Sequence, residues 1–474
     1  MIGSFLAAAL LQAVTPPAAR TPAPPDTGAV VAFDWFYAQV LANHPIARAA
    51  RLAREQAVQD VRIARGAFDP TLAATWDRKA EKGSDKYSEV DAELKLPTIT
   101  GADVKVGYSR GIGPNLNPQA GTPNAGQLAL GLSLPLGQRL VTDERRNALA
   151  QARAALDFAE NDRVSAVNTL LLRATRDYAR WFEAWRRASI ARDGVGLADF
   201  RLRAVRSRFA NGEAPAIDTL EARLEVNRRE GIRVQEEQSL FTAGLLLQAY
   251  LWDERGQPVD FAAGARPSAA SFAVPVAFDR VPTWLAAAER AHPELAKIAA
   301  RIRQIEAQRL FLGQQFIPFA ALDVSALADA DKSDGLADAG SWGENYKFGA
   351  TFRSPVLYLR ERGRFSQVNQ RLDQQRQLEA QLRRDIRNAV FVGANDVRAV
   401  DDQIALQAVT VQQARGMLAG EQRRFENGES SLLIVNLRER LVLDEEVRLA
   451  TLQARAAVAR AELAVAIGAP ARLP

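Results

Sequence analysis

The hexapeptide Arg-Phe-Ala-Asn-Gly-Glu at residues 208–213 returns as Arg-Phe-Glu-Asn-Gly-Glu at residues 424–429, an offset of 216. Other short sequences recur in the same order along the chain, which indicates an internal duplication rather than a chance echo. The first copy covers about residues 34–250 and the second about residues 281–469. The other recurring pairs are His44-Pro45 with His292-Pro293, and Leu-Pro-Leu at 134–136 with Ser-Pro-Val at 354–356.

Each hexapeptide closes a long stretch without proline, about residues 139–209 in one copy and 360–425 in the other. Roughly 70 residues of helix would extend about 105 Å. Asn-Gly suits a left-handed helix end, and a return helix begins at about Pro215 and at about Ser431. Each copy is therefore predicted to form a long antiparallel helical hairpin. A shorter opening helix, after each His-Pro pair, is expected to lie end to end with the return helix.

Strand patterns lie between the opening helix and the long helix. Leu72, Ala74 and Trp76 alternate with polar or small residues, and residues 128–134, 322–326 and 348–352 show the same period of two. Two interpretations fit: a soluble sandwich, or a membrane barrel with one apolar and one polar face. The first copy has 28 more residues in this interval, since its prolines at 70 and 135 lie 65 apart and those at 318 and 355 lie 37 apart. The excess predicts another hairpin near residues 89–108.

Composition excludes several classes of protein. The 474 residues carry a net charge of +5, with 47% apolar residues, no cysteine and two histidines. Disulfides, thiolate metal sites and a cysteine nucleophile are therefore impossible. We expect no enzyme, no cofactor and no metal site, because no nucleophile, base or phosphate loop recurs at a sensible spacing. Acidic residues interrupt the arginine-rich helices, so no nucleic-acid partner is expected.

The first residues resemble an export signal. Residues 2–14 form an apolar run, and five prolines follow between residues 16 and 25, although a positively charged start is missing. The predicted organisation is thus a signal-like segment with a proline-rich linker (1–33), repeat 1 (34–250), a linker (251–280), repeat 2 (281–469) and a tail (470–474).

The order of helix, strands, very long helix, glycine turn and return helix, all duplicated, resembles the TolC family of bacterial outer-membrane channels. The resemblance implies a mainly α fold with membrane β structure. Three identical subunits would join their long helical hairpins into a trimeric α-barrel and their strands into a trimeric outer-membrane β-barrel. It also implies a passive duct of a tripartite efflux or type I secretion system, located in the outer membrane and extending into the periplasm. The alternative is a soluble coiled-coil scaffold or interaction protein with a small β domain.

The resemblance assigns roles to the two turns. They would face a periplasmic adaptor protein, which links the channel to an inner-membrane pump. Asp218 follows the first turn and is the candidate gate residue, whereas the second turn is followed by Ile434 and Asn436, which are not acidic. These turn residues also have a local role, because they end one helix and start the next. The predicted adaptor-facing residues are Asn211, Gly212, Glu213, Asn427, Gly428, Glu429 and Ser430.

The family usually supplies two strands per repeat, so the 28 additional residues of repeat 1 depart from its pattern. Their hairpin would either enlarge the barrel or project from it as a loop, and both interpretations stay open at this point. Lysines gather here, and they fit either a solvated hairpin or a charged ring that lines the lumen. These lysines are Lys79, Lys82, Lys86, Lys95 and Lys105.

Overall fold

The computed structural model describes residues 30–118, 121–261, 264–268, 278–330 and 345–469. Most of the predicted signal-like segment (1–29) and the tail (470–474) lie outside the described residues. The helices are α1 (Phe33–Asn43), α2 (Pro45–Gly66), α3 (Glu144–Ala210), α4 (Ala216–Gln248), α5 (Val281–Ala291), α6 (Pro293–Gln314), α7 (Leu359–Glu426) and α8 (Leu432–Ile467). The strands are β1 (Val30–Val31), β2 (Thr71–Glu81), β3 (Ser84–Pro97), β4 (Asp103–Ile112), β5 (Gln127–Pro135), β6 (Arg266–Pro267), β7 (Phe319–Asp329) and β8 (Tyr346–Arg353).

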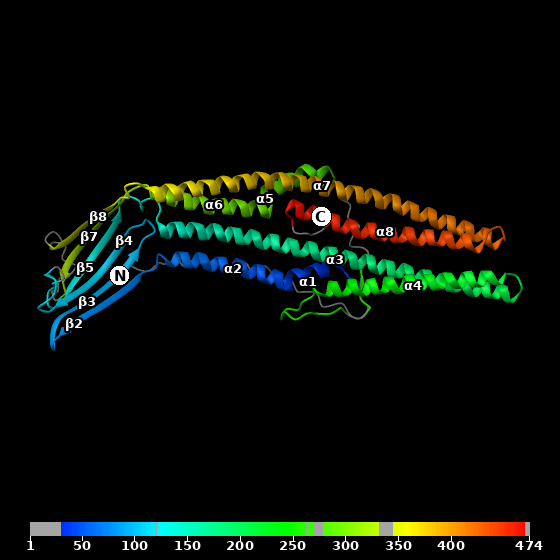
Figure 1. The fold of residues 1–474 in the computed structure, drawn as a ribbon, viewed down its shortest axis with the longest axis horizontal. Helices are drawn as coiled ribbons and strands as arrows, with labels where there is room; N and C mark the ends of the chain where they lie inside the picture. The colour runs from blue at the N-terminus through cyan, green and yellow to red at the C-terminus, as the bar shows by residue number, and fades with distance from the viewer. Residues whose placement is uncertain (1–29, 119–120, 262–263, 269–277, 331–344, 470–474) are drawn as a thin grey trace, which may run out of the picture.

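The molecule is a long rod, with the large sheet at one end and the two helix turns at the other (Figure 1). Helices α3 and α7 have 67 and 68 residues, which corresponds to about 100 Å each. Their return helices α4 and α8 have 33 and 36 residues. The two long helical hairpins predicted from the sequence are confirmed. None of the described helices combines the length and the apolar character needed to cross a bilayer.

The opening and return helices lie end to end, as expected. Helices α2 and α4 follow one another along α3, and α6 and α8 follow one another along α7 (Figure 1). The two histidines start the opening helices, because the Nδ1 atoms of His44 and His292 accept hydrogen bonds from the amides of Ile46 and Glu294, both at 3.2 Å. Burial lowers the pKa of both imidazoles, which favours the neutral form that can accept such a bond.

Helices α1 and α5, which precede these histidines, were not predicted. Each ends at its histidine, where the backbone is extended, with φ of −62° and ψ of 134° at His44. A residue before proline avoids the helical region, so the His-Pro pair separates two helices instead of opening the repeat.

The large sheet is antiparallel throughout and has the order β2-β3-β4-β5-β7-β8. Repeat 1 supplies four of its strands and repeat 2 supplies two, which confirms the additional hairpin. This hairpin belongs to the sheet, since β3 pairs with β4 from Ser88 opposite Ile112 to Pro97 opposite Asp103 without a break.

One face of the sheet is apolar across all six strands. A row of directly paired residues runs Leu72, Leu94, Val106, Leu130, Ala326 and Tyr346. The neighbouring row on the opposite face runs Thr71, Lys95, Lys105, Gly131, Ser325 and Lys347. No described element covers the apolar face, where Leu72 and Phe352 are 76% and 73% exposed. A soluble sandwich would bury this face, so the arrangement fits a sheet that meets lipid.

The main core lies near the middle of the rod and is centred on Tyr178 of α3. The Tyr178 hydroxyl donates to the Val31 carbonyl at 2.6 Å and accepts from the Ser268 amide at 3.3 Å. Burial raises the pKa of Tyr178 well above its ordinary value, so the phenol stays protonated. The ring of Phe261 stacks on Trp181 with 5.3 Å between centroids. Residues 251–261 and 264–268 of the predicted linker therefore pack against α3.

Candidate functional site: the two hairpin tips

The first tip joins α3 to α4 through Asn211, Gly212 and Glu213, all of which are exposed. Gly212 has a φ of +78°, a left-handed conformation that glycine adopts without a steric penalty. Its amide donates to the Phe209 carbonyl at 3.0 Å, and the Glu213 amide donates to the Arg208 carbonyl at 2.8 Å. This pair of bonds is a Schellman motif, which satisfies two of the last carbonyls of α3.

The second tip joins α7 to α8 with the same geometry. Gly428 has a φ of +81°. Its amide donates to the Phe425 carbonyl at 3.1 Å, and the Glu429 amide donates to the Arg424 carbonyl at 2.8 Å. Asn427, Gly428 and Glu429 are exposed, as are their counterparts in the first tip. The repeated hexapeptide therefore encodes two nearly identical turns.

Ser430 distinguishes the second tip from the first. Its hydroxyl donates to Glu421 Oε1 at 2.5 Å and so ties the turn back to the last coils of α7. The first tip has Ala214 at the corresponding position, which carries no such donor.

The two tips lie next to each other. The guanidinium of Arg208 in the first hairpin lies 5.7 Å from the ring centroid of Phe425 in the second. A small apolar cluster joins the hairpins behind the turns, which therefore form one continuous end of the molecule. The cluster consists of Leu202, Val205, Ala222, Val226, Phe425 and Leu432.

The candidate gate residue Asp218 occupies the first turn of α4 and is half-buried. No cation of the described residues lies within ion-pair distance of its carboxylate. At the second tip Ile434 is 40% exposed, whereas Asn436 is buried and accepts from Arg201 Nη1 at 2.7 Å. The first tip is thus followed by an acidic residue and the second tip is not. The role of Asp218 as a gate residue stays a prediction.

A network of buried charges lies farther along the rod, between α3, α4 and α8, and no pattern in the sequence predicts it. Glu439 is 1% exposed and accepts from Arg229 Nη2 at 2.8 Å and from Arg201 Nη1 at 2.7 Å. Arg229 is 4% exposed and also donates to Glu225 Oε1 at 2.9 Å. Arg440 closes the group with a 2.5 Å contact to Glu225 Oε2. These five residues are called the buried charge network below.

The network connects the two hairpins electrostatically. Burial disfavours the charged form of Glu225, but hydrogen bonds from Arg440 and Arg229 outweigh this effect and lower its pKa. The third guanidinium nitrogen of Arg229 is used as well, since Nη1 donates to the Gly194 carbonyl at 2.9 Å. A buried ion pair becomes costly when one partner is removed, because the other charge is left without compensation. The network therefore fixes α8 against α3 and α4.

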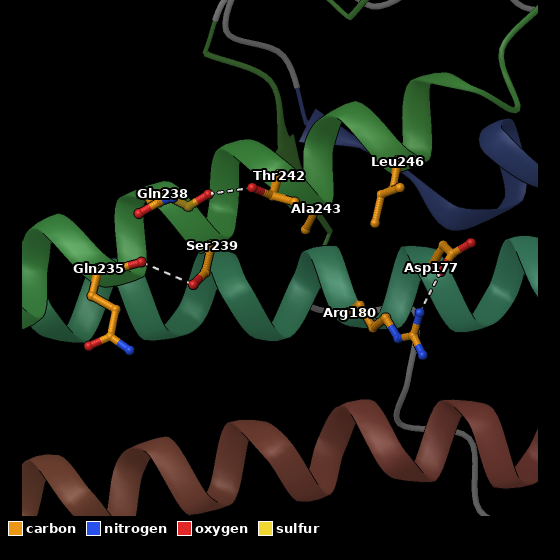
Figure 2. Close-up of a pocket in the computed structure, with 8 residues that line it drawn as sticks. All are labelled: Asp177, Arg180, Gln235, Gln238, Ser239, Thr242, Ala243 and Leu246. Atoms are coloured by element: carbon orange, nitrogen blue, oxygen red, sulfur yellow. Dashed lines mark hydrogen bonds and ion pairs between the residues drawn. The ribbon is translucent and has the colours of Figure 1, made fainter.

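A groove of about 470 Å³ lies on the surface between α3 and α4, on the sheet side of the network (Figure 2). Two of its hydroxyls are used within the helix, since Ser239 and Thr242 each donate to a backbone carbonyl at 3.0 Å. Arg180 and Asp177 form an ion pair at 3.1 Å at the other end. Its lining is therefore largely satisfied by local hydrogen bonds.

The geometry agrees with comparisons to known proteins. The model of the outer membrane efflux protein family matches residues 36–251 and 284–469. The chain belongs to the outer membrane efflux protein family. It is thus an efflux protein of the outer membrane, and the family consists of channel proteins rather than enzymes. No curated protein matches the chain in sequence.

Solved channels share the fold of this family member at low sequence identity. The CmeC outer membrane channel of Campylobacter jejuni is 12% identical, with 92% of this chain and 85% of that chain covered and a TM-score of 0.61. VceC of Vibrio cholerae is 17% identical, with 93% and 96% covered and a TM-score of 0.62. The open state of the Neisseria gonorrhoeae MtrE channel is 15% identical, with 92% and 89% covered and a TM-score of 0.62. The predicted fold class is confirmed.

Replacing Arg229 with alanine tests the buried charge network. Arg229→Ala leaves Glu439 and Glu225 with fewer partners inside the helix bundle, so the free energy of unfolding should fall by about 3 to 5 kcal/mol. The matched control is Arg192→Ala, which breaks the exposed pair of Arg192 with Glu237 at 3.3 Å. The control substitution should lower the free energy of unfolding by less than about 1 kcal/mol. Denaturant unfolding in detergent measures both, and equal losses would show that the network does not hold the hairpins together.

Proposed function

We propose that three copies of this efflux protein form one continuous channel. Their sheets would jointly cross the outer membrane, and their helical hairpins would form a tube through the periplasm. The observation that carries the proposal is the apolar face of the sheet, which is in phase over six strands and exposed in the single chain. A sheet with open edges cannot cross a bilayer alone, because its unpaired backbone groups would lie in hydrocarbon.

Exposed apolar residues on the hairpins support assembly as well. Ile217, Leu220 and Leu224 recur along one side of α4 at steps of three and four, and they are 67%, 58% and 62% exposed. Leu433 and Leu437, four residues apart on α8, are 60% and 58% exposed. Apolar patches of this kind mark surfaces that contact another protein, here a neighbouring copy or an adaptor. A soluble monomeric scaffold would leave both the helices and the sheet uncovered.

The proposed channel is a passive duct. Transport through it needs a polar lumen and an end that opens, but no catalytic group. The energy would come from an inner-membrane pump, which a periplasmic adaptor connects to the tips. The exposed turn residues Asn211, Gly212 and Glu213, with Asn427, Gly428, Glu429 and Ser430, are the proposed docking points of that adaptor.

Assembly and conduction test the proposal together. The protein, extracted from outer membranes with detergent, should have the mass of three chains, and it should conduct ions across planar lipid bilayers. Denaturant-dissociated chains provide the control and should not conduct. Recovery from cells as a water-soluble monomer without conductance would contradict the proposed function.

Charge reversal tests adaptor docking. Changing Glu213→Lys together with Glu429→Lys should strongly reduce the amount of adaptor that co-purifies from the native host, because it reverses two exposed charges at the proposed contact. Glu55→Lys is the matched control, since Glu55 is also exposed and lies on α2, far from the tips. The trimer mass should not change in either variant. Unchanged adaptor recovery with the double variant would place the docking site elsewhere.

Asp218 is proposed as the gate residue, since in a trimer three such carboxylates would approach one another near the closing end. Asp218→Asn should lower the preference of the single channel for cations over anions, because it removes negative charge from the narrowest part. Asp260→Asn, in the linker region, serves as a control of equal charge change. The reversal potential in a salt gradient measures this preference. The same reversal potential in Asp218→Asn and the unaltered channel would refute the assignment.

A further inference from the structure

The outer strands of the large sheet each have an open edge. Strands β2 and β8 stand at the two ends of the strand order, and each pairs on one side only within the described part of the chain. In hydrocarbon, every unpaired amide and carbonyl along such an edge costs several kcal/mol. The two edges therefore need partners in the membrane.

The hairpin of β2 and β3, which forms one edge of the sheet, is built as part of a membrane wall. Leu72, Ala74 and Trp76 of β2 pair with Leu94, Ala92 and Val90 of β3, on the face that carries the apolar residues of the other four strands. Trp76 is 68% exposed on this face. A hairpin that projects into water would not need an apolar face in phase with the sheet. The hairpin also occupies the edge of β4, over ten paired positions.

We propose that β8 of one copy pairs with β2 of the next copy, so that three sheets close a single barrel of three times six strands, eighteen in all. The inference rests on the proposed homotrimer. Its direction follows from the topology: β2 leaves the helical end of the rod and β8 returns to it, so the pair would be antiparallel like every other pair of the sheet. The alternation of strand directions then continues around the whole barrel.

The register follows from the strand ends. The row of paired residues that starts at Thr71, next to α2, reaches β8 at Lys347. Arg353, at the end of β8, lies six residues farther toward the helices, level with the start of the next β2. Pairing Thr71 with Arg353 thus gives a stagger of six residues for six strands.

This ratio is physically reasonable. A stagger equal to the number of strands corresponds to a strand tilt of about 36°, as in eight-stranded barrels of shear 8. Membrane barrels tilt by roughly 35–45°. The same register sets Leu72 opposite Phe352 and Trp76 opposite Phe348, all on the apolar face, and therefore keeps that face continuous across the joint.

An eighteen-stranded barrel is wider than the barrel that two strands per repeat would form. If each repeat supplied two strands, three copies would give twelve. Because the diameter of a barrel grows roughly linearly with strand number, eighteen strands would make it about 1.5 times wider. The two additional strands of repeat 1 then enlarge the wall and do not project as a loop.

Disulfide trapping tests the joint between copies. The chain has no cysteine, so introduced pairs react without background. The proposed register sets Ala73 directly opposite Thr351 of the next copy, within the Cα separation that a disulfide bridges. Ala73→Cys with Thr351→Cys should yield covalent trimers on non-reducing gels after oxidation in the membrane. Each single variant should yield at most covalent dimers.

A second pair tests the opposite arrangement. If the hairpin projected from the wall, β4 would become the edge strand, and Lys105 would meet Thr351 of the next copy. Lys105→Cys with Thr351→Cys should therefore give no covalent trimers, and their formation would overturn the proposal. Pairs of Thr351→Cys with Thr71→Cys or Thr75→Cys cover registers shifted by two residues. An intact trimer in which no β2 position reacts would also overturn it.

Native mass keeps the two proposals apart. If native mass shows a trimer and covalent linkage forms only through Lys105→Cys, the proposed channel stands and only the eighteen-stranded barrel is refuted. If native mass shows no trimer, the proposed function itself is refuted.

Discussion

The apolar face of the six-stranded sheet is the feature on which the rest of the structure depends. In a globular protein, this face would need a second layer to cover it. Here nothing in the described chain does so, although the face is continuous from Leu72 on β2 to Phe352 on β8. Lipid is the solvent that suits such a surface. Once the sheet lies in a membrane, its open edges require other copies, and the long helices must stand outside the bilayer.

The helical part obeys a different constraint. A tube through an aqueous compartment is wet on both sides, so its helices can bury only narrow apolar stripes. In the described part of the chain, the broad cores lie where the opening and return helices meet, one around Tyr178, where the linker packs on α3, and one around Val390 and Leu463. Toward the tips the apolar contacts shrink to the small cluster around Val205 and Leu432. Buried ion pairs supply the specific contacts that this thin region lacks.

Much of the fold could be predicted from the sequence, because short sequence signals determine it. The His-Pro pairs, the Asn-Gly turns and the long stretches without proline each determine backbone geometry within a few residues. The tips appear with the predicted left-handed glycines, and the hairpin of 28 additional residues appears as strands. The sequence does not show whether that hairpin joins the sheet, because the alternation of apolar and polar residues does not reveal which strand pairs with which. Strand order and register settled its place in the sheet.

The buried charge network could not be found this way, because it depends on which helices meet. The sequence of an arginine-rich helix does not show which of its arginines and glutamates face water and which face a third helix. The duplication even argues against an inherited site, since an offset of 216 sets Glu225 against Leu441 and Glu439 against Arg223. Arg201 likewise corresponds to Met417. The buried charge network is therefore not duplicated, and it is one of the features in which the two repeats differ.

That difference has a structural role. Two identical hairpins could pack against each other in either order, because their apolar stripes would be equivalent. Acids on α8 that match arginines on α3 and α4, but have no counterparts in the reverse arrangement, favour one order and one register. Repeat 1 also differs at the other end of the rod, where it supplies four strands to the sheet and repeat 2 supplies two. Divergence of the two copies thus determines both how the hairpins pack and how many strands each repeat adds to the sheet.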